Sequence, residues 1–168
     1  MADIARAAPD DVAAVAGAIQ ASGAAMFDRS PAFWRWRFEE APDLAYRFAR
    51  ASRGGDCAGL AVWREPLACE LPVGTLAEVL APRGDEAALG ALIAHACSAM
   101  ADCEAVVAGA ADPLVAAALR RAGFRQVKTH RPTVSSRDAE VLARIAAHQG
   151  PWHMSKADHD WDQIHPVP

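Results

Sequence analysis

The sequence lacks an excess of positive charge. Its 168 residues carry 21 acidic against 17 basic side chains, which gives a formal net charge of −4 at pH 7. Attraction to nucleic acid or to anionic lipid depends on clustered lysine and arginine. We therefore expect neither of them as a partner.

Cysteines are few, and none of them is spaced as a metal-ligand or redox pair. The four cysteines include no Cys-x-x-Cys motif and lie among apolar residues; they are Cys57, Cys69, Cys97 and Cys103. Isolated cysteines in such surroundings are typical of buried free thiols in a reducing compartment.

No segment has the pattern of a membrane span or of a secretory signal. The longest mostly apolar stretch, residues 87–100, is too short to cross a bilayer and contains His95. The first four residues include Asp3 and show neither the basic nor the apolar region of a signal peptide. We therefore expect a cytoplasmic protein without membrane insertion.

What is present is the composition of a globular protein. Apolar residues make up 52% of the chain and charged residues 23%. A chain of this length can bury roughly 70% of its unfolded surface in one domain. Because no repeat, linker or low-complexity run divides it, we predict a single domain over 1–168, with 137–168 as an extension.

Hydrophobic periodicity predicts strands and helices in a mixed order. Strands are expected over 4–7, 46–52, 57–64, 75–80, 105–108, 125–130 and 152–155. Helices are expected after caps at Asp10 or Asp11, Ser30, Asp85 and Asp112, and again over about 137–148. Hairpins beside strand-helix-strand units imply an α/β (α+β) fold, with a mixed, mostly antiparallel sheet and helices on both faces.

Two segments carry a resemblance to a known superfamily. Residues 76–89, LAEVLAPRGDEAAL, form a strand, a turn and a helix start, and residues 112–124 form a helix that closes with Gly123 and Phe124. In order and position they resemble the GNAT acetyltransferase superfamily over roughly residues 4–130. The first segment lies where that superfamily has the loop R/Q-x-x-G-x-G/A, and the second resembles its penultimate helix.

The resemblance implies acetyl-CoA as a co-substrate. Backbone N–H groups at the start of a helix form a site for the pyrophosphate of CoA. The strand before Pro82 would split from its neighbour and hold the pantetheine. The positions that correspond to this site are Val79, Leu80, Ala81, Arg83, Gly84 and Ala88.

Transfer of an acyl group to an amine also calls for a general base. Glu78 is the one carboxylate on the strand that leads into the loop, so we expect it to be the catalytic base. The alternative is an outward-facing strand residue with no catalytic role. The superfamily often has a tyrosine acid at the position of Leu119, whereas the single tyrosine of this chain is Tyr46.

The aromatic segment 33–38, FWRWRF, falls where the superfamily builds its acceptor site. We expect Trp34 or Trp36 to stack on a ring or sugar face and Arg37 to meet an anionic group of the substrate. Core packing of these aromatic side chains is the alternative. With residues 152–162, the segment is similar to a GNAT-like branch that occurs with bacterial polysaccharide and cell-envelope biosynthesis, which implies an amino sugar or envelope precursor as acceptor.

The C-terminal region is rich in aspartate and histidine but matches no metal motif. It lacks the glycine and the final glutamate of a calcium loop, and its histidines are not paired. We therefore expect no metal site; the residues concerned are His153, Asp158, His159, Asp160, Asp162 and His165.

Two functions remain open at this point. The first is an acyl-CoA-dependent N-acyltransferase, most simply an N-acetyltransferase for a small amine. The second is a non-catalytic GNAT-like module that binds a ligand or partner and has lost CoA, which Leu119 and Glu86 favour because Glu86 replaces a loop glycine. Asp85 and Glu86 also fit a helix N-cap followed by a first-turn acid. The sequence leaves a homodimer open as an assembly.

Overall fold

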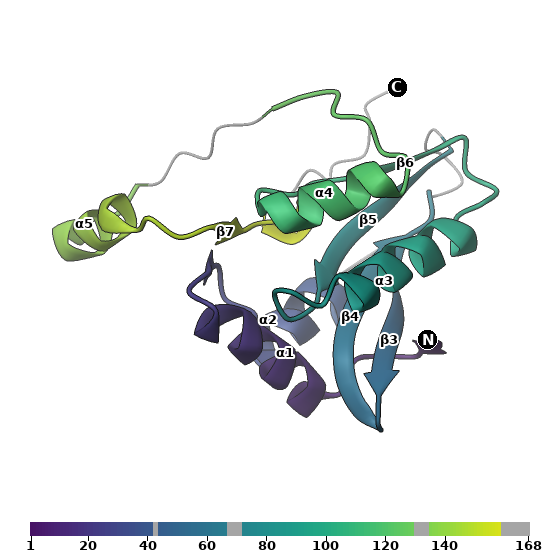
Figure 1. The fold of residues 1–168 in the computed structure, drawn as a ribbon, viewed down its shortest axis with the longest axis horizontal. Helices are drawn as coiled ribbons and strands as arrows, with labels where there is room; N and C mark the ends of the chain where they lie inside the picture. Colours follow the sequence, from purple (N-terminus) through teal and green to yellow (C-terminus); the bar gives the residue numbers. More distant parts are fainter. Residues whose placement is uncertain (42–43, 67–71, 130–134, 159–168) are drawn as a thin grey trace.

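The structure, a computed structural model, describes residues 1–41, 44–66, 72–129 and 135–158 (Figure 1). The strands are β1 (Ala2–Ile4), β2 (Ala25–Met26), β3 (Arg47–Arg53), β4 (Asp56–Arg64), β5 (Val73–Leu80), β6 (Ala105–Ala108) and β7 (Trp152–His153). The α-helices are α1 (Pro9–Ala21), α2 (Pro31–Trp34), α3 (Glu86–Ala99), α4 (Pro113–Arg121) and α5 (Ala139–Ala147). A π-helical turn, η1 (Arg35–Glu39), follows α2, and a 3-10 turn, η2 (Lys156–Asp158), follows β7.

A five-stranded sheet organises the fold. Its strand order is β1-β3-β4-β5-β6, with antiparallel pairing everywhere except between β5 and β6, which are parallel. The short strands β2 and β7 form a separate parallel pair. The mixed, mostly antiparallel sheet that the sequence predicts is therefore confirmed.

Helices cover both faces of this sheet, because alternate strand residues point to opposite sides. Phe48, Leu60 and Val62 belong to a core on one face that includes apolar residues of α1 and α2. Ala61 and Trp63 belong to a second core on the other face, with apolar residues of α3 and α4. Figure 1 shows α3 and α4 lying along the same side of the sheet. This arrangement was also expected from the sequence.

Most helix starts follow the expected capping chemistry. The side chains of Ser30, Asp85 and Asp112 accept backbone N–H bonds at the starts of α2, α3 and α4. The first helix differs, because it begins at Pro9 after Ala8 and has no side-chain cap. Proline suits the first helical position, since its missing N–H would have no helical partner there. The expected cap at Asp10 or Asp11 was therefore wrong.

Three expected strands differ from the structure. The first lies at 2–4 instead of 4–7, and the last is confined to Trp152 and His153. The strand expected over 125–130 is absent from its described part, 125–129. Its one apolar side chain, Val127, is 92% exposed, so this segment has no apolar face to bury against the sheet.

The remaining expectations concern the cysteines, the C-terminal residues and membrane spans. Three cysteines, Cys57, Cys97 and Cys103, are free and partly buried, whereas Cys69 lies outside the described residues. His159, Asp160, Asp162 and His165 also lie outside them. Among the residues that the structure describes, no helix combines the length and apolar character needed to cross a membrane.

Close packing of β4 against its neighbours gives a first prediction. A Cβ atom on Gly59 would lie 2.7 Å from the Leu80 carbonyl oxygen and 2.7 Å from Leu92 Cδ1. Gly59→Ala should therefore lower the free energy of unfolding by about 1–3 kcal/mol through overpacking. The matched change Gly90→Ala in α3, where a Cβ meets nothing within 4 Å, should raise it by about 0.5–1 kcal/mol. Urea denaturation measures both, and effects of the same sign would contradict this packing.

Candidate functional site

The sheet opens where the ladder between β5 and β6 ends. The two strands pair from Val73 and Ala105 as far as Leu76 and Ala108. β5 then continues to Leu80, whereas β6 stops, and within the described residues their pairing extends no further. We call the space between residues 77–80 and residues 109–111 the split.

A β-bulge lies at the start of the split. Val62 of β4 pairs with Glu78, but the next residue, Trp63, pairs with Leu76, so Ala77 is an extra residue on β5. Bulges are common beside functional sites, where they redirect a side chain. Here the bulge brings Glu78 onto the same face as Val62, which is the face covered by α1 and α2.

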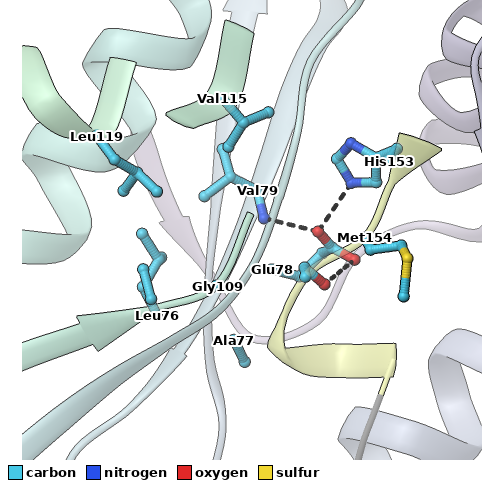
Figure 2. A pocket seen from close by; sticks show the side chains of 11 residues that line it. Leu76, Ala77, Glu78, Val79, Gly109, Val115, Leu119, His153 and Met154 are labelled. Atoms are coloured by element: carbon cyan, nitrogen blue, oxygen red, sulfur yellow. Dashed lines mark hydrogen bonds and ion pairs between the residues drawn. The ribbon is translucent and has the colours of Figure 1, made fainter. Parts of the chain in front are cut away.

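A small pocket lies at the split (Figure 2). Its apolar lining comes from β5 and α4 and consists mainly of Leu76, Val79, Val115 and Leu119. The polar part of the lining is formed by Glu78, His153 and Ser155. Figure 2 shows the last segment of the described chain running along this polar side.

Glu78 is fully buried and accepts from four partners. Its Oε2 accepts from Arg29 Nε at 2.7 Å and from Ser155 Oγ at 2.9 Å. Its Oε1 accepts from the Val79 backbone N–H at 3.0 Å and lies 3.1 Å from His153 Nε2. Both carboxylate oxygens are thus satisfied inside the protein, which is what allows a charged group to remain there.

Arg29 joins this carboxylate to a second one. Its Nη2 donates to Asp158 Oδ2 at 2.7 Å, and its side chain is as fully buried as that of Glu78. The guanidinium also lies over the ring of Phe33, 5.1 Å from the ring centroid. With His153 protonated, two positive and two negative groups balance. We call Arg29, Glu78, His153, Ser155 and Asp158 the buried charge cluster.

The cluster shifts the pKa values of its members in opposite directions. Burial alone would raise the pKa of Glu78, but the charges of Arg29 and His153, with hydrogen bonds from His153 and Ser155, lower it from 4.5 to about 2. Burial alone would lower the pKa of His153, but the Glu78 carboxylate raises it above its usual 6.5. The pair therefore favours a charged carboxylate beside a protonated imidazole.

This geometry bears on the catalytic role expected for Glu78. A carboxylate with a pKa near 2, whose oxygens are already bonded to Arg29 and Ser155, is a weak base and has little freedom to approach an amine. The outward-facing alternative does not describe it either, since Glu78 is buried. A catalytic role stays a prediction, and the contacts favour a structural one.

The residues expected to hold CoA lie together at the end of β5 and the start of α3. Their polar groups, however, have partners within the chain. The Ala88 N–H donates to Asp85 Oδ1 at 3.0 Å, and Arg83 forms an ion pair with Asp112. The same Asp85 pairs with Arg53, and this hydrogen bond, with that from Ala88, lowers its pKa.

The remaining loop positions follow the strand and its turn. Leu80 is paired with Leu60 and buried, Ala81 packs at the edge of the second core, and Gly84 has a φ of 92°, which favours glycine. Glu86 is exposed and pairs with Arg121 at 3.0 Å. The N-cap interpretation of Asp85 is therefore confirmed, and Glu86 is the first-turn acid that accompanies it.

The three residues expected at the acceptor site are separated by the structure. Trp34 is buried in the first core, in edge contact with Phe38, which favours the packing interpretation. Trp36 is 62% exposed and lies beside Phe33, with ring centroids 5.8 Å apart. Arg37 is buried, and its Nε donates to the Ala157 carbonyl oxygen at 3.1 Å. Only Trp36 is placed to meet a ligand from solvent.

Sequence reasoning missed most of the buried charge cluster. A glutamate on a central strand does call for a cationic partner, because charged residues are almost never fully buried unpaired. That signal points to some arginine or histidine but does not identify Arg29 or His153, which are 49 and 75 residues away from Glu78. Ser155 and Asp158 had no such signal.

Comparisons with known proteins add no family to this geometry. No protein-family model matches the sequence, and neither the curated proteins nor the solved structures yield a match. Within the described residues, no group of three or more histidine, cysteine, aspartate or glutamate side chains is arranged to hold a metal ion. The geometry of the site is therefore the basis for any function.

The cluster predicts a large difference between two glutamate substitutions. Glu78→Gln removes the buried charge that faces Arg29, and breaking such a pair from one side should lower the free energy of unfolding by about 3–5 kcal/mol. Glu86→Gln, the matched change at the exposed pair with Arg121, should alter it by about 0.5 kcal/mol or less. Urea denaturation at pH 7 measures both; similar values for the two variants would contradict a structural role for Glu78.

The raised pKa of His153 predicts a pH dependence with a definite sign. Its contribution to stability is fully present below pH 6.5 and is lost as the pH rises through the higher pKa of the folded state. The contribution of Glu78 is present above pH 4.5 and is lost as the pH falls through about 2. The free energy of unfolding measured from pH 6 upward should therefore fall more steeply for the parent than for His153→Gln. Parallel curves would show that His153 is not protonated in the cluster.

Proposed function

We propose that this chain is an acyl-CoA-dependent N-acyltransferase that acts on a small amine. The observation that carries the proposal is the separation of the parallel strands β5 and β6 immediately before the turn that leads into α3. A strand end that has lost its neighbour offers backbone groups to an extended ligand, as in other proteins that bind extended chains along a strand. The pantetheine arm of an acyl-CoA is such a ligand.

The helix that follows supports the same assignment. α3 starts at Glu86, directly after the turn, so its first N–H groups and its dipole lie at the end of β5 where a pyrophosphate would follow the pantetheine. Arg83 lies in the same turn and is paired with Asp112, the residue that caps α4. A diphosphate would have to compete with Asp112 for Arg83 and with Asp85 for the Ala88 N–H.

The reaction requires little covalent chemistry from the protein. The amine nitrogen attacks the thioester carbonyl, a C–N bond forms, the C–S bond breaks, and the CoA thiolate leaves. The proton released by the amine passes to solvent water and another returns to the thiolate. Glu78 has no step in this scheme, and rate enhancement comes from holding the amine and the thioester together.

One specific observation favours a second candidate, a GNAT-like binding module without turnover. The Val79 N–H, which belongs to the strand end in the split, donates to Glu78 Oε1, and His153 and Ser155 line the same pocket. In the structure the polar groups at the split therefore form hydrogen bonds with other residues of the chain. A protein that had lost CoA would keep the frame of the sheet and fill the split in this way.

Ligand stabilisation tests the proposal directly. Acetyl-CoA at 100 times its dissociation constant should stabilise the protein by about 2.7 kcal/mol, which a thermal-shift measurement detects. Val115→Phe, which enlarges a pocket-lining side chain on α4, should weaken this shift. Leu114→Phe on the same helix is the control, because Leu114 does not line the pocket and should leave the shift unchanged.

Thiol release in the presence of amino sugars then separates the two candidates. An N-acyltransferase releases free CoA from acetyl-CoA only when its amine is present. Stabilisation by acetyl-CoA without release across an amine panel would favour the binding module. Failure of acetyl-CoA and of longer acyl-CoAs to stabilise the parent would contradict the proposal.

A further inference from the structure

The split is filled by a segment from the other end of the described chain, residues 152–158, which we call the strap. On one side, His153 and Ser155 contact Glu78 of β5. On the other side, the Met154 carbonyl oxygen accepts from the Ala111 N–H, just after β6, at 3.1 Å. The strap therefore bridges the two strands at the point where they separate (Figure 2).

We propose that the strap is a removable closure, latched by the ion pair between Asp158 and Arg29, and that a ligand enters the split only when the strap is released. The inference rests on the proposed function only for the identity of that ligand. The closure itself depends only on the contacts of the strap.

The latch is made of polar contacts. Asp158 Oδ2 accepts from Arg29 Nη2 at 2.7 Å and from the Ser155 N–H at 2.8 Å. The Ala157 carbonyl oxygen accepts from Arg37 Nε at 3.1 Å. Of the apolar strap residues, only Ala157 belongs to a buried core cluster. Polar contacts can be exchanged for water at small net cost, so opening this segment uncovers only the part of the first core that Ala157 covers.

Release of the strap leaves the buried carboxylate with its main partner. Arg29 contacts Glu78 directly at 2.7 Å, and the Val79 N–H remains on the other oxygen. Glu78 would lose His153 and Ser155, whose places water or a ligand donor can take. The cost that makes buried ion pairs hard to break, an unpaired charge, therefore does not arise when the strap leaves.

Two further features favour opening. Asp158 Oδ1 is buried and has no hydrogen-bond partner in the part of the chain that the structure describes, so the closed latch is incomplete. Within α5 itself, which precedes the strap, no residue is buried, and Figure 1 shows this helix standing away from the sheet. Opening the strap therefore requires no packed helix to unfold.

The beginning of the strap is held by backbone contacts, whereas its end is held by the side chains of Arg29 and Arg37. The Ala25 N–H donates to the Pro151 carbonyl oxygen at 2.9 Å, and Ala25 pairs with Trp152 between β2 and β7. A Cβ on Gly150 would lie 2.4 Å from the Gly23 carbonyl oxygen, so this crossing is tight. Release is expected to start at Asp158 and run back toward Pro151.

Hydrogen exchange of the full chain, read by mass spectrometry, tests the latch. Asp158→Asn should speed exchange of the strap amides by about tenfold or more while the amides of β5 keep their rate. Asp138→Asn is the control: this carboxylate also accepts backbone N–H groups but is exposed at the start of α5, and its loss should leave the strap unchanged. If Asp158→Asn speeds exchange everywhere, the milder Ser155→Ala replaces it. Strap amides that exchange only together with β5 in every variant would overturn the proposal.

Entry into the split is tested with a thiol probe that needs no natural ligand. In a Val115→Cys background, labelling of the new pocket cysteine by a maleimide should be about tenfold faster with Asp158→Asn than without it, because access scales with the open fraction. Peptide mapping separates this cysteine from the native ones. Equal labelling rates would overturn the gating. Faster labelling in a protein that never binds acetyl-CoA would keep the strap and overturn only the proposed function.

Discussion

The ion pair between Glu78 and Arg29 is the constraint on which the rest of the site depends. A carboxylate at the centre of a sheet remains charged only if positive and hydrogen-bonding groups surround it. Arg29 satisfies this requirement from the segment before α2, and His153 and Ser155 add to it from residues far along the chain. The cluster thereby fixes where the segment after α1 and the segment after α5 meet the sheet.

The two faces of β5 consequently have different chemistry. Leu76 and Val79 face α3 and α4 as part of an apolar core, whereas Glu78 faces the opposite side and is bound by charged groups. The extra residue, Ala77, lies between Leu76 and Glu78 in the sequence, at the point where the pairing of β5 with β6 ends. An apolar pocket wall and a polar one therefore meet at a single strand end, which suits a ligand with an apolar arm and a polar head.

Local sequence rules predicted most of the elements but little of the site. Cap residues such as Ser30 and Asp112, and the alternation along β3 and β4, act over a few residues and can be read directly. Residues 125–129 have one apolar residue between polar ones, which resembles the pattern of a strand. In the structure these residues form no strand. The partners of Glu78 could not be predicted, because nothing local distinguishes Arg29 from the other arginines or His153 from the other histidines. Their roles follow from how distant segments cross.

The order of the cluster residues along the chain has a consequence for folding. Arg29 and Asp158 are separated by 129 residues, whereas Arg29 and Glu78 are separated by 49. During synthesis the sheet and the inner ion pair can therefore form before the strap exists, and the contact with the longest loop closes last. A chain folded only as far as α4 would present an open split to its surroundings. A molecule that fits there can bind this uncovered form before the chain covers the site with its own residues.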